Sequence, residues 1–202
     1  MERSAVGMFI GGLGLFTTVV AQVSDHEWRR PTPCGTWVAL DVLGHVGGAV
    51  GFGTELLQGG SASWEPPDPP SSAVAGEPAK WWQAVMSKSR DAVKAADPEA
   101  VVETQWGSRS LRDGLAFPTI DLFVHAWDLA AAIGSKLVLP EAAIAFARDY
   151  LSSVPEERLR NERVFGPAVA LPPGADPSSA FIAWTGRDPH WTPPSDSERG
   201  TH

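Results

Sequence analysis

Apolar residues recur at the 3.6-residue spacing of amphipathic helices in five stretches of the chain. These stretches are residues 8–23, 37–57, 80–96, 115–134 and 140–153. Thr36 is the expected N-cap of the second. The fourth begins between Leu115 and Thr119, with Pro118 in its first turn, where proline is tolerated. Four long helices joined by one long cross-connection predict an all-α fold, an antiparallel four-helix bundle with an additional C-terminal helix.

Between these stretches the sequence is rich in residues that interrupt regular structure. Residues 59–78 are dense in proline and serine and predict a long loop, and residues 103–113 predict an irregular connection. From residue 163 proline and glycine again interrupt the chain, around a short apolar piece at 180–184. We therefore expect one domain over residues 1–192 with an irregular end, and a disordered polar tail at 193–202.

The composition and charge of the chain argue against some classes of binding partner. A formal net charge of −8, from 16 basic and 24 acidic residues, argues against nucleic acid and anionic membrane surfaces. The apolar stretch 8–23 is shorter than the roughly 20 residues that span a membrane, and its flanks fit a buried helix better than a signal peptide. The single cysteine, Cys34, cannot form an internal disulfide and fits a reducing cytoplasm.

The fourth stretch carries polar residues where a buried helix should be apolar. Asp121 and His125 are four residues apart, so they share one helix face and could both bind one metal ion. His45, in the second stretch, is the best candidate for a third ligand. Imidazole and carboxylate suit Zn²⁺ and other divalent first-row metals, and three protein ligands leave a position open, as in catalytic sites. Asp128 is placed to orient His125.

Each of these residues also has a structural interpretation. A histidine on an apolar face is often a core residue that simply makes a hydrogen bond, and Asp121 could cap a turn or pair with an arginine. Cys34 is a rival reactive group, because it precedes the predicted second helix, whose dipole would lower the pKa of its thiol. No base for it is visible nearby in the sequence, so a structural thiol is the favoured interpretation.

A few further residues have functional alternatives. Three tryptophans either line a cavity or pack in the core: Trp37, Trp106 and Trp127. Arg109 and Arg112 precede the fourth helix, where they either meet an anionic substrate or are solvated loop arginines. Three histidines lie in loops or in the tail, and we expect no ligand role for them: His26, His190 and His202.

Several motifs together resemble a known family. They are residues 28–37 (WRRPTPCGTW), 40–45 (LDVLGH), 121–130 (DLFVHAWDLA), 165–169 (FGPAV) and 186–191 (GRDPHW). This set, which covers nearly the whole chain, resembles the DinB-like superfamily, in the actinobacterial branch related to mycothiol-dependent maleylpyruvate isomerase. The isomerase branch has a glutamate where this chain has Asp121.

The resemblance implies a bundle that binds a divalent metal, zinc most often or nickel, through His45, Asp121 and His125. It also implies a low-molecular-weight thiol as cosubstrate (mycothiol, bacillithiol or glutathione) and a small-molecule substrate. The implied reaction class is metal-assisted thiol transfer or thiol-dependent isomerisation. Two alternatives stay open: a metal-dependent hydrolase that needs no thiol, and a non-catalytic module that binds a metal or a ligand. Whether two copies form a homodimer through a bundle face also stays open.

Overall fold

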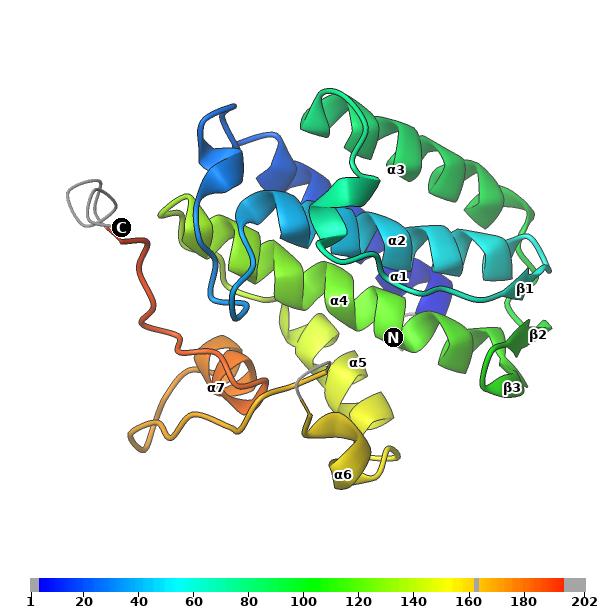
Figure 1. The fold of residues 1–202 in the computed structure, drawn as a ribbon. Helices are drawn as coiled ribbons and strands as arrows, with labels where there is room; N and C mark the ends of the chain where they lie inside the picture. Colours follow the sequence, from blue (N-terminus) through cyan, green and yellow to red (C-terminus); the bar gives the residue numbers. More distant parts are fainter. Residues whose placement is uncertain (1–3, 162–163, 195–202) are drawn as a thin grey trace.

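Four long helices form the body of the protein in the computed structural model, which describes residues 4–161 and 164–194 (Figure 1). They are α1 (Ala5–Val20), α2 (Ala39–Leu57), α3 (Pro78–Ala95) and α4 (Leu111–Ala132). Helices α2 and α3 run in one direction, while α1 and α4 run in the other (Figure 1). The chain returns along the bundle between α2 and α3, which is the predicted cross-connection. The predicted fold class, a DinB-like helical bundle, is confirmed.

The main core lies between the four helices. Its fully buried side chains include Phe9 and Phe16 of α1, Leu43 of α2, Trp82 of α3 and Leu115 of α4. Trp82 also donates a hydrogen bond from Nε1 to Thr17 Oγ1 at 2.9 Å, so α1 and α3 are joined by a polar contact inside an apolar interface. The first apolar stretch is therefore a core helix, as its length and flanks indicated.

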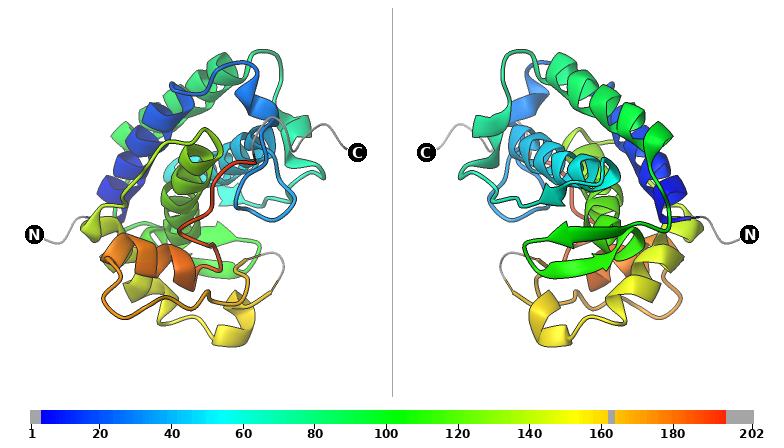
Figure 2. Two further views of the ribbon diagram at one scale, coloured as in Figure 1. Left: turned by 90° about the vertical axis from the view of Figure 1, so that its left-hand side faces the viewer. Right: turned by 90° about the vertical axis from the view of Figure 1, so that its right-hand side faces the viewer.

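A second layer covers the outer face of α4. It consists of α5 (Glu141–Leu151), α6 (Glu156–Leu159) and α7 (Pro177–Trp184), which lie on one side of the bundle (Figures 1 and 2). Ile120 and Phe123 of α4 pack there with Ile144 and Phe181. Helix α5 was predicted, whereas α6 and α7 were not. Because α4 is covered on two faces, His125 and Asp128 are buried inside the protein.

A small three-stranded sheet lies at the end of the bundle where α2 ends and α4 begins (Figure 1). Strand β1 (Ser61–Ala62) pairs in parallel with β2 (Val101–Thr104), which pairs antiparallel with β3 (Gly107–Ser110). A 3₁₀ turn, η2 (Pro70–Ala73), lies further along the cross-connection and contacts α2. The prediction of wholly irregular segments at 59–78 and 103–113 was therefore wrong. Strands of two to four residues are too short to produce a clear alternating pattern.

The start of α2 also differs from the prediction. Thr36 is not the N-cap, because Trp37 and Val38 are held outside the helix by pairing with the segment after η1 (Glu27–Arg29). The backbone N–H of Thr32 donates to the carbonyl of Trp37 at 3.0 Å, and Ala39 donates to Arg30 at 2.9 Å. Asp41 Oδ2 then accepts from the N–H of Val38 at 3.1 Å, so a first-turn carboxylate supports the helix start.

Helix α4 begins earlier than expected. Ser110 caps it, with Oγ accepting from the N–H of Asp113 at 3.1 Å. Pro118 consequently lies in the helix interior rather than in its first turn. Proline has no N–H to donate, so the helix gives up one internal hydrogen bond there. Burial of α4 on both faces supports the helix across this position.

Two further sequence predictions concern the ends and the environment of the chain. The predicted disordered tail at 193–202 lies outside the described residues, apart from its first two positions. Within residues 4–161 and 164–194, no helix combines the length and apolarity that a membrane crossing requires.

Candidate metal centre

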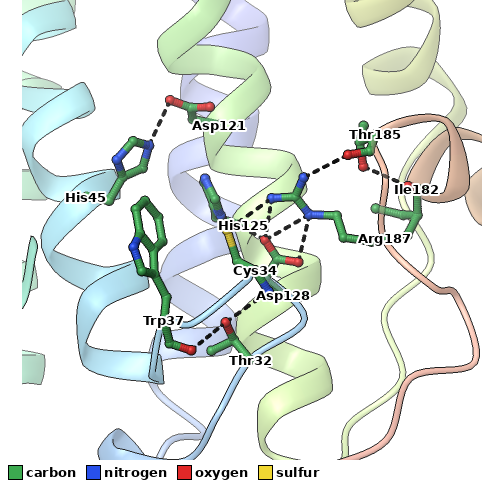
Figure 3. A network of polar contacts seen from close by, with 10 residues as sticks. All are labelled: Thr32, Cys34, Trp37, His45, Asp121, His125, Asp128, Ile182, Thr185 and Arg187. Carbon is green, nitrogen blue, oxygen red and sulfur yellow. Dashed lines mark hydrogen bonds and ion pairs between the residues drawn. The ribbon is translucent and has the colours of Figure 1, made fainter. Parts of the chain in front are cut away.

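Three side chains from two helices meet inside the bundle: His45 of α2, and Asp121 and His125 of α4 (Figure 3). Each offers one ligand atom, and these atoms all lie within 4.8 Å of one another. His45 Nε2 is 3.4 Å from Asp121 Oδ2, and the two imidazole rings lie 5.0 Å apart between centroids. The sequence spacing of four residues therefore does place Asp121 and His125 on one face, opposite His45.

The donor set fits a divalent ion. Two ligand atoms of a tetrahedral zinc ion, each about 2.0–2.2 Å from the metal, are about 3.3–3.6 Å apart. The separation of 3.4 Å between His45 Nε2 and Asp121 Oδ2 matches this value. His45 and Asp121 keep 15% and 23% of their side-chain surface exposed, so a ligand can reach this side of the cluster. The residues present can therefore hold a metal ion.

His125 is oriented by Asp128. Its Nδ1 lies 2.8 Å from Asp128 Oδ2, which leaves Nε2 as the nitrogen that can serve as a ligand. Burial lowers the pKa of the imidazole, although the Asp128 carboxylate opposes this effect. A neutral imidazole is the form that binds metal. The contact expected of Asp128 from the sequence is thus present.

Asp128 is itself held by Arg187, a residue that follows α7. Arg187 Nε lies 3.0 Å from Asp128 Oδ1, and Nη2 lies 2.9 Å from Oδ2 (Figure 3). Burial alone would raise the pKa of Asp128, but the charges and hydrogen bonds of Arg187 and His125 together outweigh burial and lower it to about 2. Sequence reasoning gave Arg187 no role. The only signal was its place in the GRDPHW motif at residues 186–191.

A second group could also offer metal ligands: Cys34, His125 and Asp128. Here, however, Arg187 Nη2 lies 3.5 Å from Cys34 Sγ and is paired with Asp128, so a cation already occupies this side. Burial raises the pKa of the Cys34 thiol to about 12, and the Asp128 carboxylate adds to the effect. The expected lowering by a helix N-terminus was wrong, because Cys34 is partly buried beside Asp128 and lies five residues before Ala39, where α2 starts.

Aromatic rings flank His45 on two sides. The Trp37 ring lies 4.9 Å from the His45 ring and 5.9 Å from that of His125, and Trp64 lies 5.1 Å from His45. Of the three tryptophans considered from the sequence, Trp37 alone makes such a contact. Trp127 is buried in the second layer, and Trp106 is 64% exposed on the sheet. Trp64, in the cross-connection, was missed, because its contact with α2 is not a local feature of the sequence.

Glycines of α2 let the cross-connection lie close to the helix beside His45. A Cβ on Gly44 would lie 2.1 Å from the carbonyl oxygen of Pro70, and one on Gly48 would lie 2.5 Å from Trp64 Nε1. Asp41 Oδ1 accepts from the N–H of Ser71 at 3.1 Å and holds η2 in place. These small residues thus let the cross-connection lie close to α2 beside His45.

The remaining candidates lie elsewhere. Arg112 pairs with Asp149 on the surface, and Arg109 donates from Nη2 to the Trp106 carbonyl at 3.2 Å. Asp121 follows Arg112 by nine residues of helix, which is about 13 Å. In the part of the chain that the structure describes, neither His26 nor His190 belongs to a group that could hold a metal. His202 lies outside the described residues.

Similar proteins were found by sequence and by structure. Two uncharacterized proteins, from two strains of Mycobacterium tuberculosis, are each 29% identical over 180 residues, covering 85% of this chain and 93% of theirs. A crystal structure of a mutant of the mycothiol-dependent maleylpyruvate isomerase superposes with a TM-score of 0.54 at 13% identity. That superposition covers 70% of this chain and 65% of the other, and it supports the fold alone.

The family itself is shown by a sequence model. The model described as the mycothiol maleylpyruvate isomerase N-terminal domain matches residues 14–130, which is more than half of the chain and includes α2, α3 and nearly all of α4. His45, Asp121, His125 and Asp128 all lie within the matched region, whereas Arg187 lies outside it. The chain therefore belongs to the mycothiol maleylpyruvate isomerase N-terminal domain family.

Proposed function

We propose that this protein binds a divalent metal ion through His45, Asp121 and His125 and uses it to activate a low-molecular-weight thiol. The thiol is of the mycothiol type, and it is transferred to a small electrophile or promotes its isomerisation. The proposal combines the chemistry of the three side chains with the name of the family. Zinc is the first candidate for the ion and nickel the second.

The observation that carries the proposal is the convergence of three ligand atoms within 4.8 Å, on a side of His125 that solvent can reach. His45 Nδ1 is buried without a hydrogen-bond partner among the described residues. His45 contacts neighbouring rings and Asp121, so few hydrogen bonds explain it as a structural histidine. Its polar contact with a side chain is made through Nε2, which faces Asp121 and is the nitrogen that would bind the ion.

The protein's own residues would prepare the site. Asp128 accepts from Nδ1–H of His125 and keeps Nε2 available as a lone-pair donor. Burial would raise the pKa of Asp121, but the hydrogen bond and charge of His45, with the charges of His125 and Arg187, outweigh burial and lower it, so the ligand is a carboxylate at neutral pH. The Trp37 and Trp64 rings flank His45 and exclude water from its faces.

The thiol would enter where the side chains of His45 and Asp121 are partly exposed. A divalent ion, when bound, lowers the pKa of a coordinated thiol and so supplies a thiolate nucleophile near neutral pH. Cys34 does not provide such a thiolate itself, since burial raises its pKa to about 12. A thiol cosubstrate from solution is therefore the better match to this chain.

The test is a metal analysis joined to a thiol titration on the same sample. We expect one zinc or nickel ion per chain in the wild type, and loss of that ion in His45→Ala and in His125→Ala. His26→Ala is the matched control, since His26 is exposed and outside the cluster. Mycothiol should bind only to the metal-loaded protein. Full metal occupancy in both cluster variants would refute the site, and turnover of electrophiles without any thiol would refute the thiol role.

A further inference from the structure

Arg187 is a buried arginine that belongs to neither bundle helix of the metal centre. Its guanidinium makes three contacts with Asp128: Nε with Oδ1 at 3.0 Å, Nε with Oδ2 at 3.2 Å and Nη2 with Oδ2 at 2.9 Å. Nη1 donates to the Thr185 carbonyl at 3.2 Å, and Nη2 also lies 3.5 Å from Cys34 Sγ. The residue is 7% exposed, and Asp128 is fully buried.

The geometry links this pair to His125. Asp128 Oδ2 receives both Arg187 Nη2 and His125 Nδ1, the latter at 2.8 Å (Figure 3). An arginine fork that grips both carboxylate oxygens fixes the plane of the carboxylate. Because that carboxylate receives Nδ1–H of the imidazole, fixing its plane also fixes which nitrogen of His125 carries the hydrogen and where Nε2 points.

The position of Arg187 is set by the second layer. Helix α7 ends in a turn in which Thr185 donates to Phe181 at 3.0 Å and Arg187 donates to Ile182 at 3.3 Å. Gly186, between them, has a φ of +86° and packs against Gly166. The guanidinium is thus delivered to Asp128 by a packed turn rather than by a free end of the chain.

We propose that Arg187 is a positioning residue of the metal centre, which acts through Asp128 to hold His125 with Nε2 directed at His45 and Asp121. This inference rests on the proposed function, in which those three residues bind the ion. It extends the site beyond residues 14–130, which carry the family match, to a residue that the second layer contributes. Removal of Arg187 should therefore weaken metal binding although Arg187 contacts none of the three ligands.

The first test is a double-mutant cycle read as Zn²⁺ affinity in a competition titration with a chelating dye. We expect Arg187→Met to weaken Zn²⁺ binding by about 10- to 100-fold, the usual effect of losing an outer partner of a ligating histidine. In an Asp128→Asn background the same change should weaken binding by less than about threefold, because the path through Asp128 is already broken. Equal losses in both backgrounds would overturn the proposal.

The matched control is Arg160→Met. Arg160 also ties the second layer together, with Nη1 donating to the carbonyls of Gly166 at 2.9 Å and Trp184 at 2.7 Å, but it does not touch Asp128. We expect Zn²⁺ affinity close to that of the wild type. A loss as large as that of Arg187→Met would show that general loosening of the layer, and not positioning of His125, is responsible.

The second test uses metal-free protein, so its result does not depend on the proposed function. Two-bond ¹H–¹⁵N correlation spectra report the tautomer of His125, and we expect the Nδ1–H form in the wild type and a loss of that preference in Arg187→Met. If Arg187→Met does not fold, Arg187→Lys keeps the charge but lacks the fork, and should show a partial loss. An unchanged tautomer in the folded variants overturns the proposal. A wild type that shows the Nδ1–H form yet binds no metal overturns the proposed function, and only the positioning of His125 by Arg187 then remains.

Discussion

The two sides of the His125 imidazole are built differently. On the Nδ1 side, which we call the closed side, Asp128, Arg187 and Cys34 are joined by contacts of 2.8–3.5 Å, and Asp128 is fully buried. On the Nε2 side, which we call the open side, His45 and Asp121 keep part of their surface exposed, and their closest approach is 3.4 Å. On the closed side the protein's own residues fill the hydrogen bonds of the carboxylate and of Nδ1. On the open side the ligand atoms of His45, Asp121 and His125 can still bind an ion.

The two sides of the ring therefore have different roles: the closed side orients His125, and the open side is suited to bind an ion. Charge on the closed side is balanced by the arginine, so these residues stabilise the fold and orient the ring. On the open side a carboxylate and two imidazoles converge, and no lysine or arginine among the described residues forms an ion pair with Asp121, an arrangement that suits a metal ion. Ion pairs that look similar in a contact map therefore have different consequences when they are broken.

The largest expected effect is the loss of stability when the closed side is broken. In metal-free protein, Asp128→Ala leaves Arg187 buried without its partner and should lower the free energy of unfolding by about 3–5 kcal/mol. Asp121→Ala removes a partly exposed partner of His45 and should cost about 0–1 kcal/mol. Urea unfolding followed by circular dichroism measures both values. Equal losses would show that the two sides do not differ in this way.

The closed side should also account for more of the decrease in the free energy of unfolding at low pH. The pKa of Asp128 is about 2 in the folded protein, below the value near 3.9 of a free aspartate. A lowered pKa means that the contribution is complete above pH 4 and is lost as the pH falls from 4 toward 2. The expected loss is about 2 kcal/mol for this group.

Unfolding curves of metal-free protein between pH 5 and 2 test this expectation. Asp128→Asn should flatten the dependence in that window, because the titrating group is gone. Asp121→Asn is the matched variant on the open side, and it should retain the drop that Asp128 causes. A flat profile in the wild type would show that Arg187 does not hold Asp128 ionised, and the closed side would lose its defining property.

Local sequence patterns were sufficient for the parts of the protein that depend on local periodicity. The four bundle helices follow from apolar spacing, and the shared face of Asp121 and His125 follows from four-residue separation on a helix. His45 was the best candidate for a third ligand, and the family resemblance supported this choice, since no rule of spacing joins two separate helices. The metal itself stays a prediction.

Features that depend on distant partners could not be predicted. Arg187 reaches Asp128 across 59 residues, from a turn after a short helix that the sequence did not indicate. The start of α2 was misplaced because pairing of Pro31 with Val38 keeps Trp37 extended. In each case a contact between separate segments overrides a local preference.

The smallest expected effect decides which side holds the ion. Cys34→Ala removes only a weak contact with Arg187, so it should change the free energy of unfolding by about 1 kcal/mol and leave Zn²⁺ affinity unaltered. Asp121→Asn should abolish that affinity, although it perturbs the fold little. In Co²⁺-loaded protein the absorption spectrum should lack the intense sulfur-to-metal bands of a thiolate ligand. The opposite result, loss of metal in Cys34→Ala with retention in Asp121→Asn, would place the ion beside Cys34 and Asp128. We do not expect it, because Arg187 already supplies the positive charge on that side.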